Sequence, residues 1–252
     1  MKILVVSAHP DPASLTNALR GVAVGQLEAD GHEVRVTDLY AEDWKSAVDR
    51  ADFPTLPDAA RLRVPAASSA AFTTGTLTAD VTTEQAKLLW ADALILAFPL
   101  WWFSMPAILK GWIDRVYAYG FAYGVGEHSE TRWGDRYGEG TLAGKRAMLV
   151  VTAGGWETHY GPRGINGPID DLLFPIQHGV LFYPGYAVLP PFVVFQTFGV
   201  LKPPYVTYTV LALVGSTRTR VRNRPGSVPV PDAAHAGVAA VPLVVLNSCP
   251  LL

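Results

Sequence analysis

The sequence predicts an α/β fold in which helices cover both faces of one open, parallel, doubly wound sheet. Five short apolar segments are separated by helical patterns, and near-continuous apolar runs are typical of parallel strands buried on both faces. Half of the 252 residues are hydrophobic, so the chain can bury a sizeable core. Its length fits one large domain or two small ones.

The amino-terminal segment predicts a βαβ unit. Nearly every residue from Lys2 to Ser7 is apolar, which indicates a central strand. Ser14, or the residue before it, can cap a helix whose apolar positions lie on one face, and Gly31 ends that helix. The stretch from Glu33 to Leu39 is the second expected strand.

Residues 40 to 80 mix prolines, small residues and polar residues without a period. We expect a long excursion that is ordered against the body of the protein. The pattern from Val81 to Trp90 then predicts a helix, which leads into a strand that begins at Ala93. This arrangement is a second right-handed crossover.

The third expected strand breaks at Pro99, where the loop Leu100–Phe103 begins. Ser104 is a plausible N-cap and Pro106 stands early in a helix that runs to Tyr117. The later elements also alternate between strand and helix: a strand from Arg146 to Thr152, a helix that begins at Pro168, and a fifth strand from Tyr186 to Leu189.

Strand order decides which loops meet. In the order 2-1-3-4-5, loops after the first and third strands leave on opposite sides and form a crevice at the carboxyl ends of the strands. The loops expected there are His9 to Asn17, Pro99 to Phe103, and Thr152 to Tyr160. A ligand site is therefore predicted at this edge.

The first of these loops contains neither GxGxxG nor a Walker sequence. Ser14, Thr16 and Asn17 nevertheless offer side-chain hydrogen-bond donors at a helix N-terminus, where free backbone N–H groups favour phosphate. Simple helix capping is the alternative interpretation.

The second and third loops favour a planar ligand. Consecutive rings at Trp101, Trp102 and Phe103 cannot all point into the core, although core packing is the usual role of aromatic residues. Gly154 and Gly155 permit close approach of backbone amides, and Tyr160 can donate a hydrogen bond to charge developing on the ligand.

Other chemistries lack support. His159 and His178 have no spaced partner typical of a metal site, so both are interpreted as structural or surface residues and no metal is expected. The sequence has no GxSxG and no credible Ser-His-Asp set. A net charge of −2, with no basic stripe in the first 170 residues, argues against nucleic acid or an anionic membrane as the main partner.

Localisation follows from sparse signals. Cys249 is the only cysteine, which excludes an internal disulfide framework and favours a reducing compartment. The amino terminus reaches Pro10 too soon for a secretory signal, and no run of 18 charge-free apolar residues predicts a membrane span. A cytoplasmic protein is expected.

The chain changes character near residue 197. From residue 172 onward Asp232 is the one acid, prolines are frequent and no amphipathic period emerges. We therefore expect a domain at 1–196 and an atypical tail at 197–252. Composition favours a disordered tail; the alternative hypothesis is a frameshift, a retained intron or a mispredicted end.

Several segments together carry a family resemblance over about residues 1–195: AHPDPASLTNAL, FPLWWFSMPAILKGWIDRV, GFAYG and TAGGWETHYGPRGINGPIDDLLFPIQHGVLFYPG. They resemble the flavodoxin-like NAD(P)H:quinone oxidoreductases, the DT-diaphorase family. The resemblance implies a homodimeric flavoprotein. It would take hydride from NAD(P)H onto flavin N5, release the nicotinamide, and then reduce a quinone by two electrons at the same site.

The resemblance also assigns residues. The phosphate and adenosine loop of the family matches His9, Ser14, Leu15, Thr16 and Asn17, and the segment bordering the isoalloxazine matches Pro99, Leu100, Trp101, Trp102 and Phe103. The loop on the pyrimidine side matches Thr152, Gly154, Gly155 and Tyr160. Tyr123 matches an aromatic residue that approaches the substrate from the dimer partner, so the substrate set is Tyr123, Trp102 and Phe103. The length of the 40–80 excursion favours FAD over FMN.

Two departures from the family pattern stand out. Two-electron quinone reductases carry a histidine in a GIHG context, where this chain has Asn166. Histidine could accept a proton near flavin O2, whereas asparagine can only hydrogen-bond. We expect Tyr160 to carry the catalytic role with Asn166 as a dipole. The second departure is the tail, because relatives end in a charged amphipathic helix that supports the FAD site.

Two other functions remain open from the sequence. One is a regulatory flavoprotein subunit like the ancillary proteins of potassium-efflux systems, which share this fold. The other is a truncated, non-catalytic flavin-binding domain, if the tail prevents tight flavin retention. A flavodoxin-type electron carrier fits least, because the chain is long and lacks an acidic docking surface.

Overall fold

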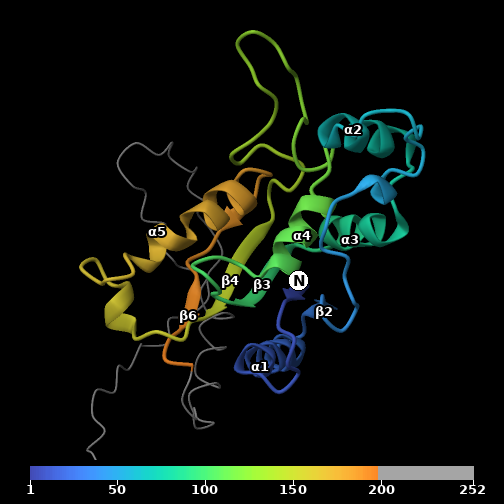
Figure 1. Cartoon of the computed structure of the whole chain (residues 1–252). Coiled ribbons are helices and arrows are strands. Elements are labelled where there is room, and N and C mark those ends of the chain that lie inside the picture. Colours follow the sequence, from blue (N-terminus) through green and yellow to red (C-terminus); the bar gives the residue numbers. More distant parts are fainter. Residues whose placement is uncertain (198–252) are drawn as a thin grey trace, which may run out of the picture.

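A six-stranded parallel sheet forms the centre of the protein in a computed structural model that describes residues 1–197 (Figure 1). The strand order is β2-β1-β3-β4-β5, with β6 also paired to β4, so the predicted order 2-1-3-4-5 is confirmed. Residues 198–252, which make up nearly all of the predicted tail, lie outside the described residues. The strands are β1 (Lys2–Ser7), β2 (Glu33–Asp38), β3 (Ala93–Pro99), β4 (Arg146–Thr152), β5 (Ala187–Val188) and β6 (Phe192–Val194).

The helices pack on both faces of this sheet, as the doubly wound prediction requires (Figure 1). They are α1 (Leu15–Ala29), α2 (Val64–Thr74), α3 (Ala79–Trp90), α4 (Ala107–Val116) and α5 (Ile169–Phe174), with short 3₁₀ turns η1 (Arg50–Asp52) and η2 (Glu157–Tyr160) and the π-helix η3 (Pro175–Phe182). None of the described helices is long and apolar enough to cross a membrane.

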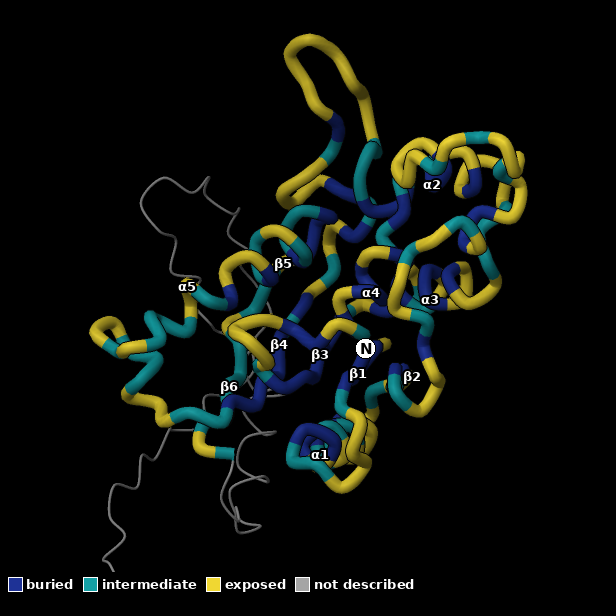
Figure 2. Tube along the Cα trace, in the orientation of Figure 1, coloured by how far each residue is buried: buried dark blue, intermediate teal, exposed yellow. Residues whose placement is uncertain are grey.

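Alternation along the strands builds two core layers. Leu4 of β1 and Leu96 of β3 belong to the larger cluster, which includes Trp112 of α4. Val5 and Ile95, one position along, join the cluster that contains Leu27 of α1. Successive side chains of a strand point to opposite faces, so each central strand supplies both layers. Figure 2 shows the central strands as the most deeply buried part of the molecule.

The 40–80 excursion is ordered, as expected, but it contains a helix that the sequence pattern did not predict. Helix α2 consists mainly of small residues, so it lacks the contrast between apolar and polar faces that reveals an amphipathic helix. The excursion has its own small core of Phe53, Ala67 and Ala71. Gly75 ends α2 in the left-handed conformation, with a φ of 67°.

The far edge of the sheet differs from the prediction of five strands. The expected strand Tyr186–Leu189 is reduced to β5, which pairs only with the start of β4. Pro190 and Pro191 follow, and proline cannot donate a ladder hydrogen bond. The chain resumes pairing as β6 along the end of β4, so two short strands occupy one edge.

A second correction concerns Ser104. It was expected to cap α4, but Pro106 occupies the N-cap position and no side chain caps the helix. The backbone of Ser104 is instead paired with Trp101, with N–O distances of 3.0 and 3.1 Å. The Ser104 carbonyl accepts the Trp101 backbone N–H, and the helix begins only at Ala107. Ser104 therefore belongs to the turn before the helix.

Candidate functional site at the carboxyl edge of the sheet

Strand register brings the three predicted loops to one edge. Ser7 of β1 pairs with Ala97 of β3, and Pro99 at the end of β3 pairs with Thr152 at the end of β4. The loops that begin after these residues therefore leave the sheet together. This position is where open parallel sheets bind their ligands.

The loop after β1 is fixed by its own hydrogen bonds. The Ser14 hydroxyl accepts from the Asn17 backbone N–H at 3.2 Å, so Ser14 caps α1 as predicted. The Asn17 amide nitrogen donates to the carbonyls of Asp11 at 2.9 Å and His9 at 3.5 Å. His9 Nδ1 accepts from the backbone N–H of Asp11. In a neutral imidazole this bond places the proton on Nε2, leaving that nitrogen as a donor.

Direct contacts join this loop to the other two. The hydroxyls of Thr16 and Thr152 lie 2.8 Å apart and are buried, although 136 positions separate them in the sequence. The Leu100 backbone N–H donates to the Thr152 carbonyl at 2.8 Å. The rings of His9 and Trp101 have centroids 6.0 Å apart. The structure thus brings together the three loops that the sequence predicts.

The loop after β3 is a tight turn with unusual residues. Trp101 and Ser104 close it through two backbone hydrogen bonds, and the central residues Trp102 and Phe103 both have positive φ, 49° and 62°. Bulky residues rarely adopt this left-handed conformation, which costs about 1–2 kcal/mol per residue. Trp102 is 95% exposed and Phe103 is 47% exposed. The prediction that these rings cannot all point inward is correct.

The third loop presents Tyr160 at the end of η2. The Tyr160 ring packs on Phe195, with centroids 5.3 Å apart. Gly155 lies so close that a Cβ added there would stand 2.9 Å from the Tyr160 ring, so only glycine fits beside this ring without a shift. The Asn166 backbone N–H donates to the His159 carbonyl at 2.9 Å, which holds Asn166 beside η2.

Tyr123 is the one predicted site residue that lies elsewhere in the chain. It follows α4, whereas the Trp101–Ser104 turn precedes that helix. The ten residues of α4 span about 15 Å. Tyr123 is half-buried, and burial, followed by the neighbouring Tyr119 and Tyr183, raises its pKa. The ring contact of Tyr123 among the described residues is with Tyr119 and not with a residue of the three loops.

The residues at the loop cluster fit a flavin. Asn17 Oδ1 is buried and has no hydrogen-bond partner among the described residues, while the amide nitrogen is already used. Such an unpaired acceptor suits a hydroxyl of a ribityl chain. The capped N-terminus of α1 supplies backbone N–H groups for phosphate, and exposed rings supply an apolar wall for a planar ring system.

Two further features of the described residues have little or no signal in the sequence. One is β6, which carries Phe195 to the Tyr160 ring; its short apolar run after two prolines is the only signal. The other is an aromatic stack in which His178 lies between Phe174 and Tyr137, at 4.8 Å from each ring centroid. His178 was interpreted as structural or a surface residue, and no sequence spacing predicts this stack. Among residues 1–197, no group of three or more His, Cys, Asp and Glu side chains could hold a metal ion.

Comparisons with known proteins agree with this geometry. Residues 1–204 match a family described as having a flavodoxin-like fold. The chain is 64% identical over 249 residues to a ribosyldihydronicotinamide dehydrogenase-like protein, traD, of Penicillium crustosum, covering 98% of this chain and 90% of the relative. It is 38% identical over 213 residues to NAD(P)H dehydrogenase [quinone] 1 of Cavia porcellus, covering 84% and 74%.

A solved structure extends the agreement to three dimensions. A Klebsiella pneumoniae protein described as a quinone reductase superposes with a TM-score of 0.80 at 60% identity, covering 84% of this chain and 82% of that one. The family match spans more than half of the chain, and the two relatives are named as a dehydrogenase-like protein and an NAD(P)H dehydrogenase. The chain therefore belongs to the flavodoxin-like NAD(P)H:quinone oxidoreductase family and is an oxidoreductase.

Proposed function

We propose that the protein is a flavin-dependent NAD(P)H dehydrogenase that reduces a quinone or a similar acceptor by two electrons. The observation that carries this proposal is the meeting of the three loops, through the Thr16–Thr152 hydroxyl contact and the His9–Trp101 ring contact. A bound flavin would supply the hydride acceptor and donor. The two substrates would use the site in turn, in a ping-pong sequence.

The residues of the chain would hold and orient the cofactor. The amides at the Ser14-capped end of α1 and the Nε2 donor of His9 suit its phosphates. The Trp101–Ser104 turn would border the ring system, because its two left-handed residues display their rings to the outside. Gly154 and Gly155 would let backbone amides approach the opposite, polar edge of the ring.

Tyr160 would stabilise the negative charge that develops on the ring during reduction. Its hydroxyl is a donor, and Phe195 and Gly155 fix its ring. Asn166 would add a dipole beside it, and would not take up a proton as histidine can. Tyr160→Phe should slow reduction of the enzyme by NAD(P)H by about tenfold, less than the 10²–10³ of a fully buried donor, because Tyr160 is only half-buried. An unchanged rate in anaerobic stopped-flow experiments would refute this role.

The identity of the cofactor and the oligomeric state complete the proposal. We infer FAD in preference to FMN from the length of the 40–80 excursion, and a homodimer in which Tyr123 reaches the site of the other copy. The separation of Tyr123 from the loop cluster by α4 supports this arrangement. The cytoplasmic location stays a prediction.

The decisive experiment starts from the purified full-length protein. Its absorbance spectrum should show flavin bands, and chromatography of the cofactor released by heat should identify FAD. Anaerobic mixing with NADH or NADPH should bleach those bands, and a quinone should restore them. Light scattering should give the mass of a dimer. A colourless protein that does not bind added flavin would refute the proposal and favour the non-catalytic domain.

A further inference from the structure

Helix α2 lies against the loop that carries Tyr123, and we propose that α2 positions the Tyr123 ring and so sets the affinity for the electron acceptor. Residues Tyr117–Tyr123, which follow α4, form this acceptor loop. The inference rests on the proposed function, because it takes Tyr123 as the residue that contacts the acceptor. The 40–80 excursion, which contains α2, would then determine how tightly the acceptor binds.

Three contacts join α2 to the acceptor loop. The Ser68 hydroxyl accepts a hydrogen bond from the Tyr119 backbone N–H at 2.9 Å. The rings of Phe72 and Phe121 have centroids 6.2 Å apart. Gly120 has a φ of 89°, and a Cβ added there would stand 2.7 Å from the Phe72 ring. The loop is therefore fitted closely to one face of α2.

The same loop residues hold Tyr123. The Gly120 backbone N–H donates to the Tyr123 carbonyl at 2.7 Å. The Tyr119 ring packs edge-on against the Tyr123 ring, with centroids 5.2 Å apart. A Cβ at Gly124 would stand 2.3 Å from the Tyr119 ring, so this packing leaves no free space. Because Tyr119 is anchored by Ser68, the position of α2 is passed on to the Tyr123 ring.

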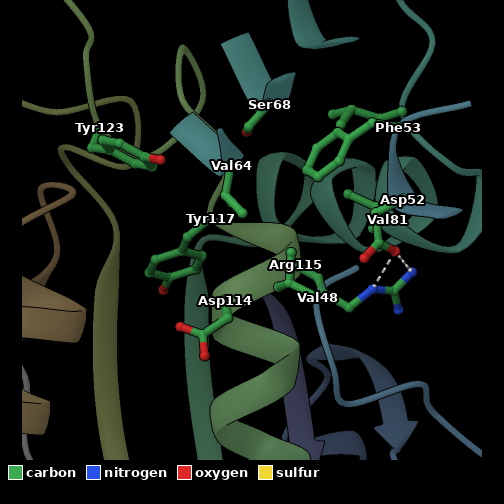
Figure 3. A pocket seen from close by; sticks show the side chains of 11 residues that line it. Val48, Asp52, Phe53, Val64, Ser68, Val81, Asp114, Arg115, Tyr117 and Tyr123 are labelled. Atoms are coloured by element: carbon green, nitrogen blue, oxygen red, sulfur yellow. Dashed lines mark hydrogen bonds and ion pairs between the residues drawn. The ribbon is translucent and has the colours of Figure 1, made fainter. Parts of the chain in front are cut away.

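A small cavity lies beside Tyr123 and α2. Its lining includes Val64 and Ser68 of α2, Tyr117, Arg115 and Tyr123 (Figure 3). Its volume of about 20 Å³ is close to the space that one water molecule needs. The Tyr123 ring therefore borders a cavity on one side, and its ring contact among the described residues is with Tyr119, which α2 holds through Ser68.

An ion-pair cluster around the buried Arg115 holds α2 in place. Arg115, which is on α4 just before the acceptor loop, pairs with Asp52 ahead of α2 at 2.9 Å and with Asp80 behind it at 2.6 Å. The Arg115 side chain is 2% exposed. One guanidinium therefore fastens both flanks of α2 to the helix that leads into the acceptor loop. Figure 3 shows its contact with Asp52.

Phe72→Ala and Ser68→Ala test the inference, with Leu89→Ala as the control because it removes an exposed apolar side chain from α3. Hydrogen exchange of the peptide 117–124 in the flavin-loaded protein should become faster in both test variants and stay unchanged in the control. The KM for a naphthoquinone should rise about two- to tenfold, the range that loss of one aromatic contact produces. The KM for a smaller benzoquinone should rise less, and kcat should change little.

Each outcome decides the question. Faster exchange with a higher KM and an unchanged thermal midpoint supports positioning by α2. Faster exchange with an unchanged KM refutes it, because the loop would then move without affecting the acceptor. Unchanged exchange also refutes it. If the wild-type protein reduces no quinone, the proposed function fails, and the exchange data still show whether α2 holds the acceptor loop.

Discussion

Replacing the buried hydroxyl pair at the loop junction should separate folding from flavin binding. Thr16 and Thr152 are 1% and 5% exposed, and their hydroxyls form a hydrogen bond of 2.8 Å. Thr152→Val keeps the β-branched shape but leaves the Thr16 hydroxyl buried without this partner. Such a loss costs about 1–3 kcal/mol. For a chain of about 250 residues it should lower the Tm of the apoprotein by about 2–12 °C.

The double variant Thr16→Val/Thr152→Val distinguishes a structural role of the two hydroxyls from a role in flavin binding. Replacing both members of a hydrogen-bonded pair by apolar groups of the same shape is nearly neutral for stability, so the apoprotein should recover much of its Tm. Flavin affinity should not recover if the hydroxyls also contact the cofactor. Each lost hydrogen bond of about 0.5–1.5 kcal/mol should then raise the flavin Kd about two- to twelvefold.

Calorimetry of the apoprotein and a fluorescence titration with flavin measure the two quantities separately. Thr73→Val, at an exposed position of α2 far along the chain from the loops, controls for the Thr-to-Val change itself. A double variant that regains both stability and flavin affinity would show that the pair is only structural. Single variants with wild-type stability would refute the buried hydrogen bond.

Three further predictions concern the support of the acceptor loop. Arg115→Met should lower the free energy of unfolding by about 1–3 kcal/mol in urea titrations, because it removes one cationic partner of the buried Asp52 and leaves Lys45 as the other; Arg115→Met/Asp52→Asn should recover part of the loss. Acid should destabilise the protein through Asp80. Burial opposes ionisation of this carboxyl, but hydrogen bonds from Thr78 and Arg115 outweigh burial and lower its pKa in the folded protein. The stability that Asp80 contributes is therefore fully present above the unfolded pKa of about 3.9 and is lost as the pH falls through the folded pKa. Asp80→Asn should flatten that pH dependence, and an unchanged slope would contradict it. Tyr117→Phe should leave the Tm unchanged or raise it, because the buried hydroxyl has no partner among the described residues; a lower Tm would contradict this reasoning.

The sheet was predictable because each buried parallel strand is a short apolar run that can be recognised in the local sequence. The runs at Lys2–Ser7 and Arg146–Thr152 are apolar on both faces, and the observed strands begin and end where those runs do. Helix α2 was not predictable in this way, because its contacts are made by small residues and by Phe72 and do not form an apolar stripe. The division of the edge into β5 and β6 depends on the register in which each short strand pairs with β4, a property of the assembled sheet.

The sequence allows us to predict which loops form the site, but not which side chains contact one another there. Strand order alone puts the loops at one edge, but no spacing reveals that Thr16 faces Thr152 across 136 positions. The turn at Trp102 and Phe103 broke a local rule, since sequences that need positive φ usually provide glycine or asparagine. Backbone strain of this kind concentrates at functional sites, where the surrounding fold maintains it.

The two halves of the proposed site stand at opposite ends of one helix. The Trp101–Ser104 turn precedes α4, and the acceptor loop follows it about 15 Å away. A planar cofactor held at the turn would be covered on one face by its own chain, whereas the Tyr123 ring of that chain follows the other end of α4. Under the proposed homodimer, Tyr123 would contact the acceptor bound to a second copy. The buried Arg115 cluster would then link the folding of one copy to the acceptor site of its partner, because it fastens α2 beneath the loop that the partner uses.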